Sequence, residues 1–242
     1  MCPIFGYGCA VSTSDPPKES GRNKVPKNSK TVHPLETHQL DRAAQVLGRA
    51  FRNDRVLEYV VPDDARRVRL VTSFVGRVVR YSLSYGEVYT TPALESVACW
   101  LPPKNPRPTY VRMLRTGLLT ASLKFGWAGL RKLIEIETYL EKVHRRTLPG
   151  PHWYLWWLGV DPSRQGEGIG GALMQPVLGR AEAEGLPCYL ETDDERNLPF
   201  YRRHGFEVVS DSEVPKHGLR FWAMAEYPPS GTIATSSPRN TS

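Results

Sequence analysis

Apolar residues recur at helical spacing through much of the first half of the chain. Between residues 37 and 52 they return every three or four positions, and Thr37 is placed to cap the first turn. A second pattern of this kind starts at Asp63 or Asp64, either of which suits a helix N-cap, and Gly86 suits its end. Its apolar stripe consists of Val68, Val71, Val75, Val78 and Val79. The spacing therefore predicts helices over residues 37–52 and over residues from 63 or 64 to 85.

Short apolar runs bounded by turn residues predict the strands. These runs span residues 31–35, 87–90, 96–101, 152–160, 187–191, 206–210 and 219–226. Helical spacing returns over residues 110–146, with breaks expected near Gly126 and Gly129. It returns again after the glycine-rich residues 164–171, up to about residue 184, and once more over residues 197–204. Strands that alternate with helices around a mixed sheet indicate an α+β fold with three α/β/α layers.

The run 152–160 is unusually aromatic, with Trp153, Tyr154, Trp156 and Trp157. Alternation along a strand places Trp153 and Trp157 on one face with Leu155. We expect most of these rings to lie in the core, with one or two lining a pocket for a flat or apolar ligand. Three aromatic residues of the preceding helical segment are candidates for the same pocket: Tyr110, Phe125 and Trp127.

Composition fits one enzyme-sized domain. The chain has 242 residues, of which 40% are hydrophobic, enough for one sizeable core. The formal net charge of +7 is concentrated in residues 1–30 and 107–146. The chain contains no run of about 18 apolar residues and no signal-peptide pattern, so we expect no membrane-spanning helix and a cytoplasmic location. The four cysteines lack metal-ligand spacing, and we expect no metal.

The ends of the chain differ from its middle. Residues 1–30 and 228–242 are rich in small, polar and proline residues, which predicts disordered tails, the first of them basic. Residues 31–227 carry the periodic patterns and are expected to form one domain, with a helical insert at 107–148.

A glycine-rich stretch, residues 164–171, lies between the run 152–160 and a helical pattern. Such a turn leaves several backbone N–H groups at a helix N-terminus, where they bind anions. A P-loop is excluded because no Gly-Lys-Ser/Thr ends the stretch. The stretch can be read as G-x-G-x-x-G with Gly171 as the third glycine, but no βαβ series precedes it, which argues against a dinucleotide site. A tight turn without a ligand is the remaining structural alternative.

Two motifs indicate a family. The pattern Gln165-x-x-Gly168-x-Gly170 resembles the pyrophosphate loop of the GNAT acetyltransferase superfamily. The stretch N-L-P-F-Y-x-x-x-G-F from Asn197 to Phe206 resembles a second element of that family in compressed form, and a Leu-Glu-Thr strand end precedes it. The likeness covers about the last third of the chain and is closest, from residue 153 to 224, to a member that acetylates an antibiotic. It is much weaker before residue 153.

The resemblance implies a GNAT-type mixed sheet and acetyl-coenzyme A as cosubstrate. The pantetheine arm would pair with the strand at Leu158, Gly159 and Val160, and the N–H of Val160 would meet the thioester carbonyl. Backbone donors would hold the pyrophosphate at Arg164, Gln165, Gly166, Glu167, Gly168, Ile169, Gly170 and Gly171. Asn197 would touch the cofactor, cap the short helix, or do both.

The resemblance also implies the catalytic residues. Tyr201 would donate a proton to the departing thiolate, since a phenol is protonated at neutral pH; otherwise it only packs beside Phe200 and Phe206. Glu191 would accept the amine proton through water, or else it is a buried carboxylate that holds Arg196 or backbone donors. We expect His152 to be structural rather than catalytic, and residues 193–195 to form a solvated loop.

The leading hypothesis is an acetyl-CoA-dependent N-acetyltransferase that transfers acetyl to a small-molecule amine by direct attack in a ternary complex, with antibiotic or xenobiotic detoxification as one case. Acetylation of peptide or protein amines is an alternative, as is a non-catalytic acyl-CoA sensor. The basic and apolar pattern of residues 111–132 allows a membrane or nucleic-acid module, but we prefer a lid over the substrate cleft. We expect no nucleic-acid partner, no stable membrane association, and a monomer or homodimer.

Overall fold

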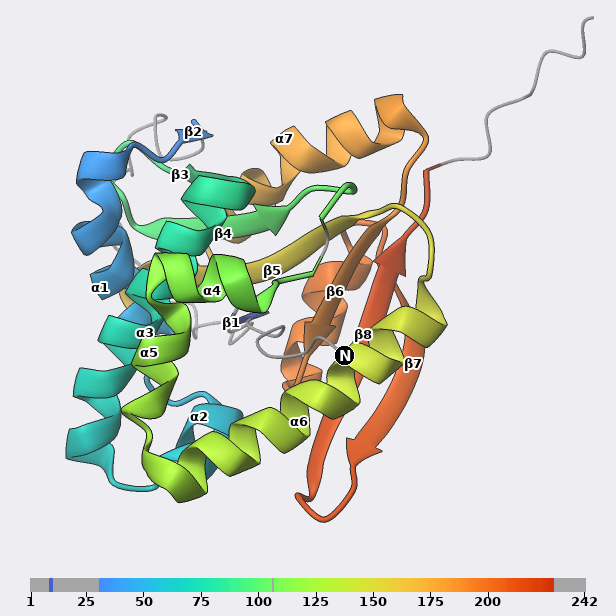
Figure 1. Cartoon of the computed structure of the whole chain (residues 1–242). Helices are drawn as coiled ribbons and strands as arrows, with labels where there is room; N and C mark the ends of the chain where they lie inside the picture. The colour runs from blue at the N-terminus through green and yellow to red at the C-terminus, as the bar shows by residue number, and fades with distance from the viewer. Residues whose placement is uncertain (1–8, 11–30, 106, 229–242) are drawn as a thin grey trace, which may run out of the picture.

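A computed structural model describes residues 9–10, 31–105 and 107–228 (Figure 1). Eight strands form one mixed sheet; seven of them follow the order β2-β3-β4-β5-β6-β8-β7, and β1 pairs with β5 outside this path. Their bounds are β1 Cys9–Ala10, β2 His33–Pro34, β3 Glu87–Thr90, β4 Ser96–Leu101, β5 Trp153–Val160, β6 Cys188–Thr192, β7 Glu207–Val214 and β8 Leu219–Glu226. The predicted tails, 1–30 and 228–242, lie almost entirely outside the described residues.

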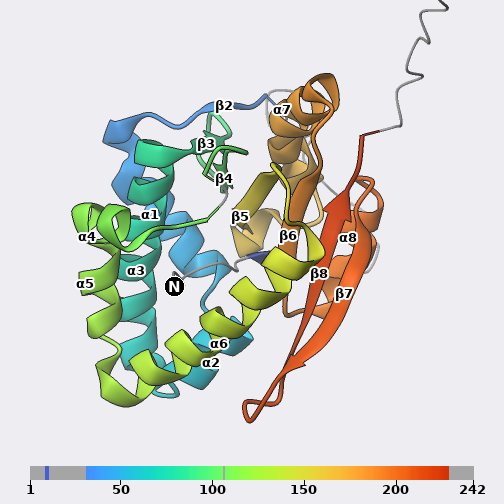
Figure 2. The ribbon, with the colours of Figure 1, turned by 45° about the vertical axis from the view of Figure 1, so that its right-hand side comes forward.

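Helices cover both faces of the sheet (Figures 1 and 2). One face carries α1 Leu40–Ala50, α2 Arg55–Val60, α3 Asp64–Tyr85, α4 Tyr110–Thr116, α5 Leu118–Leu123 and α6 Gly126–Thr147. The other face carries α7 Ile169–Glu184 and α8 Leu198–Arg202. Each face has its own apolar cluster, so the predicted α+β fold with three layers is confirmed.

The helix starts show which sequence signals decided the local structure. Asp63 caps α3 by accepting the N–H of Arg66 at 2.6 Å, and Gly86 follows its last residue, as predicted. Thr37 is not the cap of the first helix, because a 3-10 turn begins there and the N–H of the preceding Glu36 donates to the side chain of Gln39 at 3.0 Å. Val68 is 38% exposed and does not belong to the buried stripe of α3.

The helical insert has three pieces rather than two. The first break falls at Gly117, which has a φ of 75°. The second falls at the start of α6, where Gly126 has a φ of 80°. Gly129 does not break α6; a side chain there would come within 2.9 Å of the carbonyl oxygen of Val60, so this glycine lets α6 pack closely on α2. The six-residue α2, which we did not predict, is too short for a periodic pattern, although Asp54 caps it.

A β-bulge in β5 changes the facing of its aromatic residues. Cys99 of β4 lies opposite Trp157, but the next residue, Trp100, lies opposite Leu155, so one residue of β5 is extra. Trp157 therefore packs on Phe51, with ring centroids 4.5 Å apart, on the helix face that bears α1 and α3. The expectation that Trp157 shares a face with Trp153 and Leu155 is wrong, because simple alternation does not survive the bulge.

Two further findings concern membrane-spanning helices and the cysteines. Among the described residues no helix is long and apolar enough to cross a membrane. Cys99 and Cys188 are buried free thiols, and burial raises the pKa of Cys99 to about 12, so this thiol stays protonated and unreactive.

Candidate active site

The two central parallel strands separate soon after they begin. β5 and β6 pair only at Trp153 with Cys188 and at Tyr154 with Tyr189. Beyond this point β5 continues for six residues without pairing to β6, while β4 stays bonded along its other edge. The half of β5 that ends at Val160 therefore has one edge open toward β6.

The ladder between β4 and β5 tells which backbone groups point to this open edge. The N–H of Asp161 donates to the carbonyl of Glu95 at 2.8 Å, and bonded pairs alternate in an antiparallel ladder. Gly159 is therefore the residue bonded to β4, and the N–H and C=O groups of Leu158 and Val160 point the other way. The side-chain amide of Gln165 donates to the carbonyl of Val160 at 3.3 Å, which agrees with this orientation.

An extended segment of the chain already uses this edge. β1, at Cys9–Ala10, pairs in parallel with Leu158 and Gly159. Since β4 occupies the opposite edge at the same residues, β1 lies on the side that faces β6. The open edge of β5 can therefore take an extended backbone at the residues we predicted for pantetheine.

Glycine has two different uses in the loop after β5. Gly166 and Gly168 have positive φ of 82° and 77°, and a side-chain carbon at either position would meet no atom within 4 Å. Gly170 and Gly171 instead lie against α8: a Cβ on Gly170 would come within 3.4 Å of Phe200, and one on Gly171 within 2.5 Å of His204. Two glycines thus leave bare backbone beside open space, and two allow α7 and α8 to pack closely.

Within the described part of the chain, the start of α7 offers unused donors. Gly168 is its N-cap without a side-chain capping bond, and the first helical bond runs from the N–H of Ala172 to the carbonyl of Gly168. The N–H groups of Ile169, Gly170 and Gly171 are thus the orphan donors that a helix N-terminus turns toward an anion. This geometry fits a pyrophosphate.

Arg164, by contrast, has no free donor in its main chain. Its N–H donates to the carbonyl of Asp161 at 2.8 Å, and its guanidinium pairs with Glu95 at 2.6 Å and with Glu167 at 2.8 Å. Arg164 and Glu167 therefore hold the loop against β4 through their side chains. The stretch of candidate backbone donors begins after Arg164.

Tyr201 and Asn197 lie on the α7–α8 side of the sheet. Tyr201 is fully buried in α8, with its ring 5.0 Å from that of Phe200 and 6.0 Å from that of Phe206. Asn197 precedes α8 but makes no side-chain capping bond; its amide donates to the hydroxyl of Thr192 at the end of β6, at 3.2 Å. Asn197 is thus the N-cap residue of α8, as predicted, but its side-chain amide ties α8 to the strand that borders the opening.

Glu191 lies on the opposite face of β6 and is 2% exposed. It accepts hydrogen bonds from the phenols of Tyr154 at 2.6 Å and Tyr189 at 2.9 Å. Burial raises the pKa of Glu191 well above its usual range, the charges of two α6 carboxylates add to this, and the two phenol donors oppose it. The alternative partner, Arg196, is instead bound to Asp194 at 2.7 Å.

Asp193 is a site candidate that the sequence analysis missed. It is 5% exposed rather than part of a solvated loop, and its Oδ2 has no hydrogen-bond partner within the described part of the chain. Burial raises the pKa of Asp193 to about 6, although the charge of Arg55 opposes the shift. Asp193 follows the last residue of β6 and lies beside Arg55 and Val56 of α2, a contact between distant segments that the sequence alone does not show.

His152 has a structural role, as expected. Its Nδ1 lies 2.7 Å from the carbonyl oxygen of Gly150, and its Nε2 lies 2.7 Å from Nε2 of His144. A carbonyl only accepts, so His152 carries its proton on Nδ1 and accepts a bond from His144. Burial lowers the pKa of His152 to about 4 and that of His144 well below its usual value, so both rings are neutral near pH 7.

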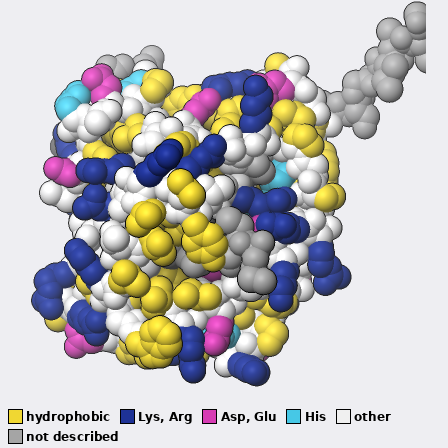
Figure 3. Space-filling view, in the orientation of Figure 1, with side chains coloured by type: hydrophobic (Ala, Val, Ile, Leu, Met, Phe, Trp, Pro, Cys, Tyr) yellow, Lys and Arg dark blue, Asp and Glu magenta, His cyan; other side chains and the backbone are white. Residues whose placement is uncertain are grey.

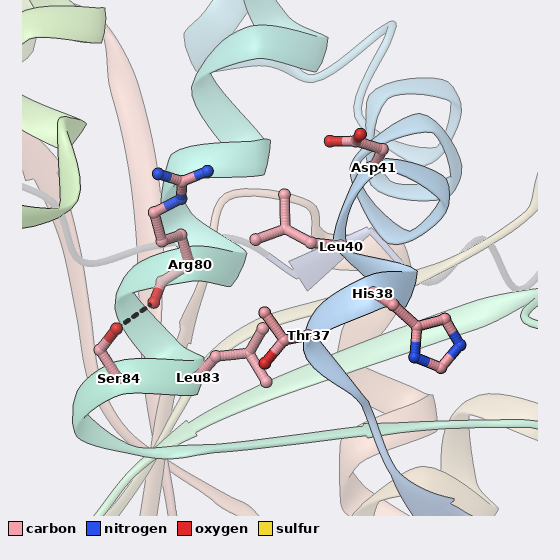
Figure 4. Close-up of a pocket in the computed structure, with 7 residues that line it drawn as sticks. All are labelled: Thr37, His38, Leu40, Asp41, Arg80, Leu83 and Ser84. Carbon is pink, nitrogen blue, oxygen red and sulfur yellow. Dashed lines mark hydrogen bonds between the residues drawn. The ribbon is translucent and has the colours of Figure 1, made fainter.

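Other parts of the described structure offer weaker sites. A surface depression between the start of α1 and α3 is lined by none of the predicted site residues (Figure 4). It is formed by Thr37, His38, Leu40, Asp41, Arg80, Leu83 and Ser84. The described residues contain no group of three or more His, Cys, Asp or Glu side chains placed to hold a metal ion.

Comparisons with known proteins agree with this geometry. Residues 120–206 match the acetyltransferase (GNAT) family. The uncharacterized N-acetyltransferase C550.08 of Schizosaccharomyces pombe is 27% identical over 180 residues, which cover 71% of this chain and 72% of that protein. N-alpha-acetyltransferase RimI of Mycobacterium tuberculosis is 31% identical over 84 residues, or 35% of this chain and 46% of that protein.

Solved structures share the fold. The crystal structure of histone acetyltransferase HPA2 and related acetyltransferase from Corynebacterium glutamicum superposes with a TM-score of 0.57 at 23% identity, over 84% of this chain and 98% of that one. Polyamine N-acetyltransferase of Drosophila melanogaster gives 0.51 at 12% identity, over 81% and 99%. The chain thus matches the GNAT acetyltransferase family over residues 120–206, resembles N-acetyltransferases in sequence, and shares the fold of solved acetyltransferases.

Proposed function

We propose that the protein transfers the acetyl group of acetyl-coenzyme A to the amine of a small molecule, by direct attack while both substrates are bound. The observation that carries this proposal is the divergence of β5 from β6 after Tyr154, which leaves the backbone groups of Leu158 and Val160 on an edge that does not pair with β6 and that already takes an extended segment, the two-residue β1. A pantetheine arm is an extended chain with amide groups. It would complete this edge as another strand does.

The loop after β5 would hold the pyrophosphate. The orphan N–H groups of Ile169, Gly170 and Gly171 point toward an anion, and Gly166 and Gly168 bear no side chain that would keep the phosphates away. The side chain of Gln165 fixes the loop to Val160. The N–H of Val160, on the same edge, is the donor we assign to the thioester oxygen, where negative charge develops during attack.

Acid and base would act from opposite faces of the sheet. Tyr201 lies on the face of α7 and α8, and it is the donor we assign to the thiolate. The carboxylates of Glu191 and Asp193 lie on the other face. Burial raises the pKa of both carboxylates, and that of Asp193, about 6, suits a group that takes up a proton near neutral pH, since a general base works best with a pKa close to the working pH.

The acceptor class rests on a protein that shares the fold and on the buried carboxylates. The polyamine N-acetyltransferase of Drosophila melanogaster, which shares the fold, catalyses the formation of N-acetylagmatine, and a small amine is compatible with buried carboxylates on the acceptor face. The motifs from residue 153 to 224 are similar to those of puromycin N-acetyltransferase, which adds detoxification of an antibiotic or another xenobiotic as one case. We assign the reaction to a domain of residues 31–227.

The test is a thiol-release assay with the full-length protein. Acetyl-CoA is mixed with a panel of polyamines, arylalkylamines, aminoacyl nucleosides and peptides with free N-termini, and free coenzyme A is measured. Release that depends on one class of amine, with the acetylated product found by mass spectrometry, supports the proposal. Tight binding of acetyl-CoA without release for any amine would instead indicate a sensor, and release only with peptides would move the acceptor to protein N-termini.

A further inference from the structure

The helical insert exposes large apolar side chains on its outer side. Val111 and Leu114 of α4 are 61% and 59% exposed, Leu123 of α5 is 57% exposed, and Trp127 near the start of α6 is 82% exposed. Tyr110 is 40% exposed beside them. We call these five residues the insert surface.

The insert surface is additional to the core-facing side of the same helices. Met113, Leu118 and Phe125 are buried and belong to the apolar cluster under α3, so the insert already has a face packed on the protein. From the sequence we preferred a lid whose apolar residues serve only as core. Such a lid does not explain why the insert has a second, exposed apolar face. Exposed apolar residues grouped on one surface usually mark a place of contact with another body.

The segment that carries the insert surface has an excess of basic residues, although Glu135, the next acidic residue along α6, pairs with Arg131 at 3.6 Å. Residues 104–134 contain seven lysines and arginines and no aspartate or glutamate. Arg115 and Lys124 are exposed next to the apolar residues of α4 and α5, and Arg131 follows Trp127 by one helical turn. Figure 3 shows hydrophobic side chains gathered over α4 and α5, with basic side chains around them.

We propose that the insert surface docks on an anionic lipid bilayer. Apolar side chains would enter the headgroup region while the basic residues meet lipid phosphates, as in amphipathic helices that lie in the membrane interface. Tryptophan prefers this interface because its ring is apolar and its N–H is polar. The residues protrude rather than line a groove, which suits a deformable lipid layer better than a rigid protein partner.

This inference does not depend on the acetyltransferase reaction, since it concerns α4, α5 and the start of α6 rather than the opening between β5 and β6. It changes the expectation from sequence that the protein makes no stable membrane contact. The acceptor substrate and the membrane contact can therefore be tested separately.

The experiment is co-sedimentation of the full-length protein with vesicles of phosphatidylcholine alone or with 30% phosphatidylserine. The double variant Leu114→Ser/Trp127→Ser removes apolar contact, and Arg115→Glu/Lys124→Glu reverses two charges. Both changes are at exposed positions, so folding should persist and is checked by circular dichroism. Tyr227→Ser, at another exposed aromatic residue after β8, is the apolar control, and Arg202→Glu/Arg203→Glu, in and beside α8, is the charge control.

The proposal expects binding to the anionic vesicles and about tenfold weaker partitioning for each insert variant, with both controls unchanged. Removing one leucine that is buried in the bilayer weakens partitioning by about fivefold or more, and so does removing one basic residue near an anionic surface. Equal binding by wild type and both insert variants would overturn it and assign any attraction to the basic N-terminal residues. Wild-type binding to neither vesicle would also overturn it.

Fluorescence gives an independent readout of the same contact. The other five of the six tryptophans are at most 5% exposed, so a quencher in the lipid reaches Trp127 almost alone. Brominated lipids should quench the wild type and leave Trp127→Phe with no further loss of emission. Quenching that persists in Trp127→Phe would mean that the protein unfolds on the vesicle rather than docking through the insert.

Discussion

Replacing single glycines in the loop after β5 separates cofactor binding from stability. Gly166 and Gly168 have positive φ and open space where a Cβ would be placed. Gly185 matches both features, with φ of 66° and no atom within 4 Å, but it ends α7 instead of starting it. Gly185→Ala is therefore a control that carries the same backbone strain at the far end of the same helix.

We expect all three alanine variants to lose about 1 kcal/mol of unfolding free energy, because an L-residue in the left-handed region costs about that much. For a domain of this size the loss lowers Tm by about 2–4 °C. Only Gly166→Ala and Gly168→Ala would place a methyl group against the phosphates. Loss of one or two charged hydrogen bonds, at about 1.5–3 kcal/mol each, would raise the Kd for coenzyme A at least about tenfold.

Thermal unfolding and titration calorimetry with coenzyme A, followed by acetyl-CoA saturation curves, measure the two effects. The reasoning predicts equal losses of Tm in the three variants, raised KM for acetyl-CoA in two, and little change in kcat. An unchanged affinity in Gly168→Ala, or an equal rise of KM in Gly185→Ala, would refute the assignment of a phosphate site to this loop.

Three other predictions concern the groups that border the opening. Asp193→Asn should raise the unfolding free energy at pH 7 by about 2–3 kcal/mol. The folded-state pKa of Asp193, about 6, lies above the ordinary value, so above that pH the wild type carries an unfavourable buried charge that asparagine does not have. This gain should vanish below about pH 4 in urea unfolding, and activity should fall; a variant that is no more stable at pH 7 contradicts the raised pKa. Tyr201→Phe should lower kcat about 10²-fold or more with the KM for acetyl-CoA nearly unchanged, as loss of a general acid does, and a normal kcat would make Tyr201 a packing residue only. In Ala10→Pro the residue at position 10 has no N–H to donate to the edge of β5, which should weaken the pairing of β1. If β1 and pantetheine compete for this edge, calorimetry should show that Ala10→Pro binds coenzyme A about 2–10-fold more tightly than Ala10→Ser does. Equal Kd values for the two variants would exclude competition.

Local signals were enough for most elements. The hairpin of residues 87–90 and 96–101, the cap at Asp63 and the helix ending at residue 184 follow from turn residues, caps and periodicity, which act over a few neighbouring positions. The resemblance to the GNAT family also follows from local motifs, since the loop from Gln165 to Gly170 and the stretch from Asn197 to Phe206 are short and contiguous and lie within the residues that match the family.

Interactions between distant segments decided the rest. The bulge at Trp156 depends on how β4 pairs with β5, and it reverses the facing of Trp157 in a way that alternation along one strand does not foresee. The length of helix α6 through Gly129 depends on contact with α2, a segment about seventy residues earlier.

The sequence by itself determined where a phosphate-binding turn could form, because positive φ and bare backbone are properties of glycine at given positions. It also marked Tyr201 and Glu191 through their motifs. Only the tertiary structure decided that Arg164 is held by Glu95 and Glu167, that Asp193 is buried with an oxygen that has no partner among the described residues, and that β5 separates from β6 beyond Tyr154. Burial, charge pairing and strand divergence arise from residues far apart in the chain, and they set both the pKa values and the space at the site.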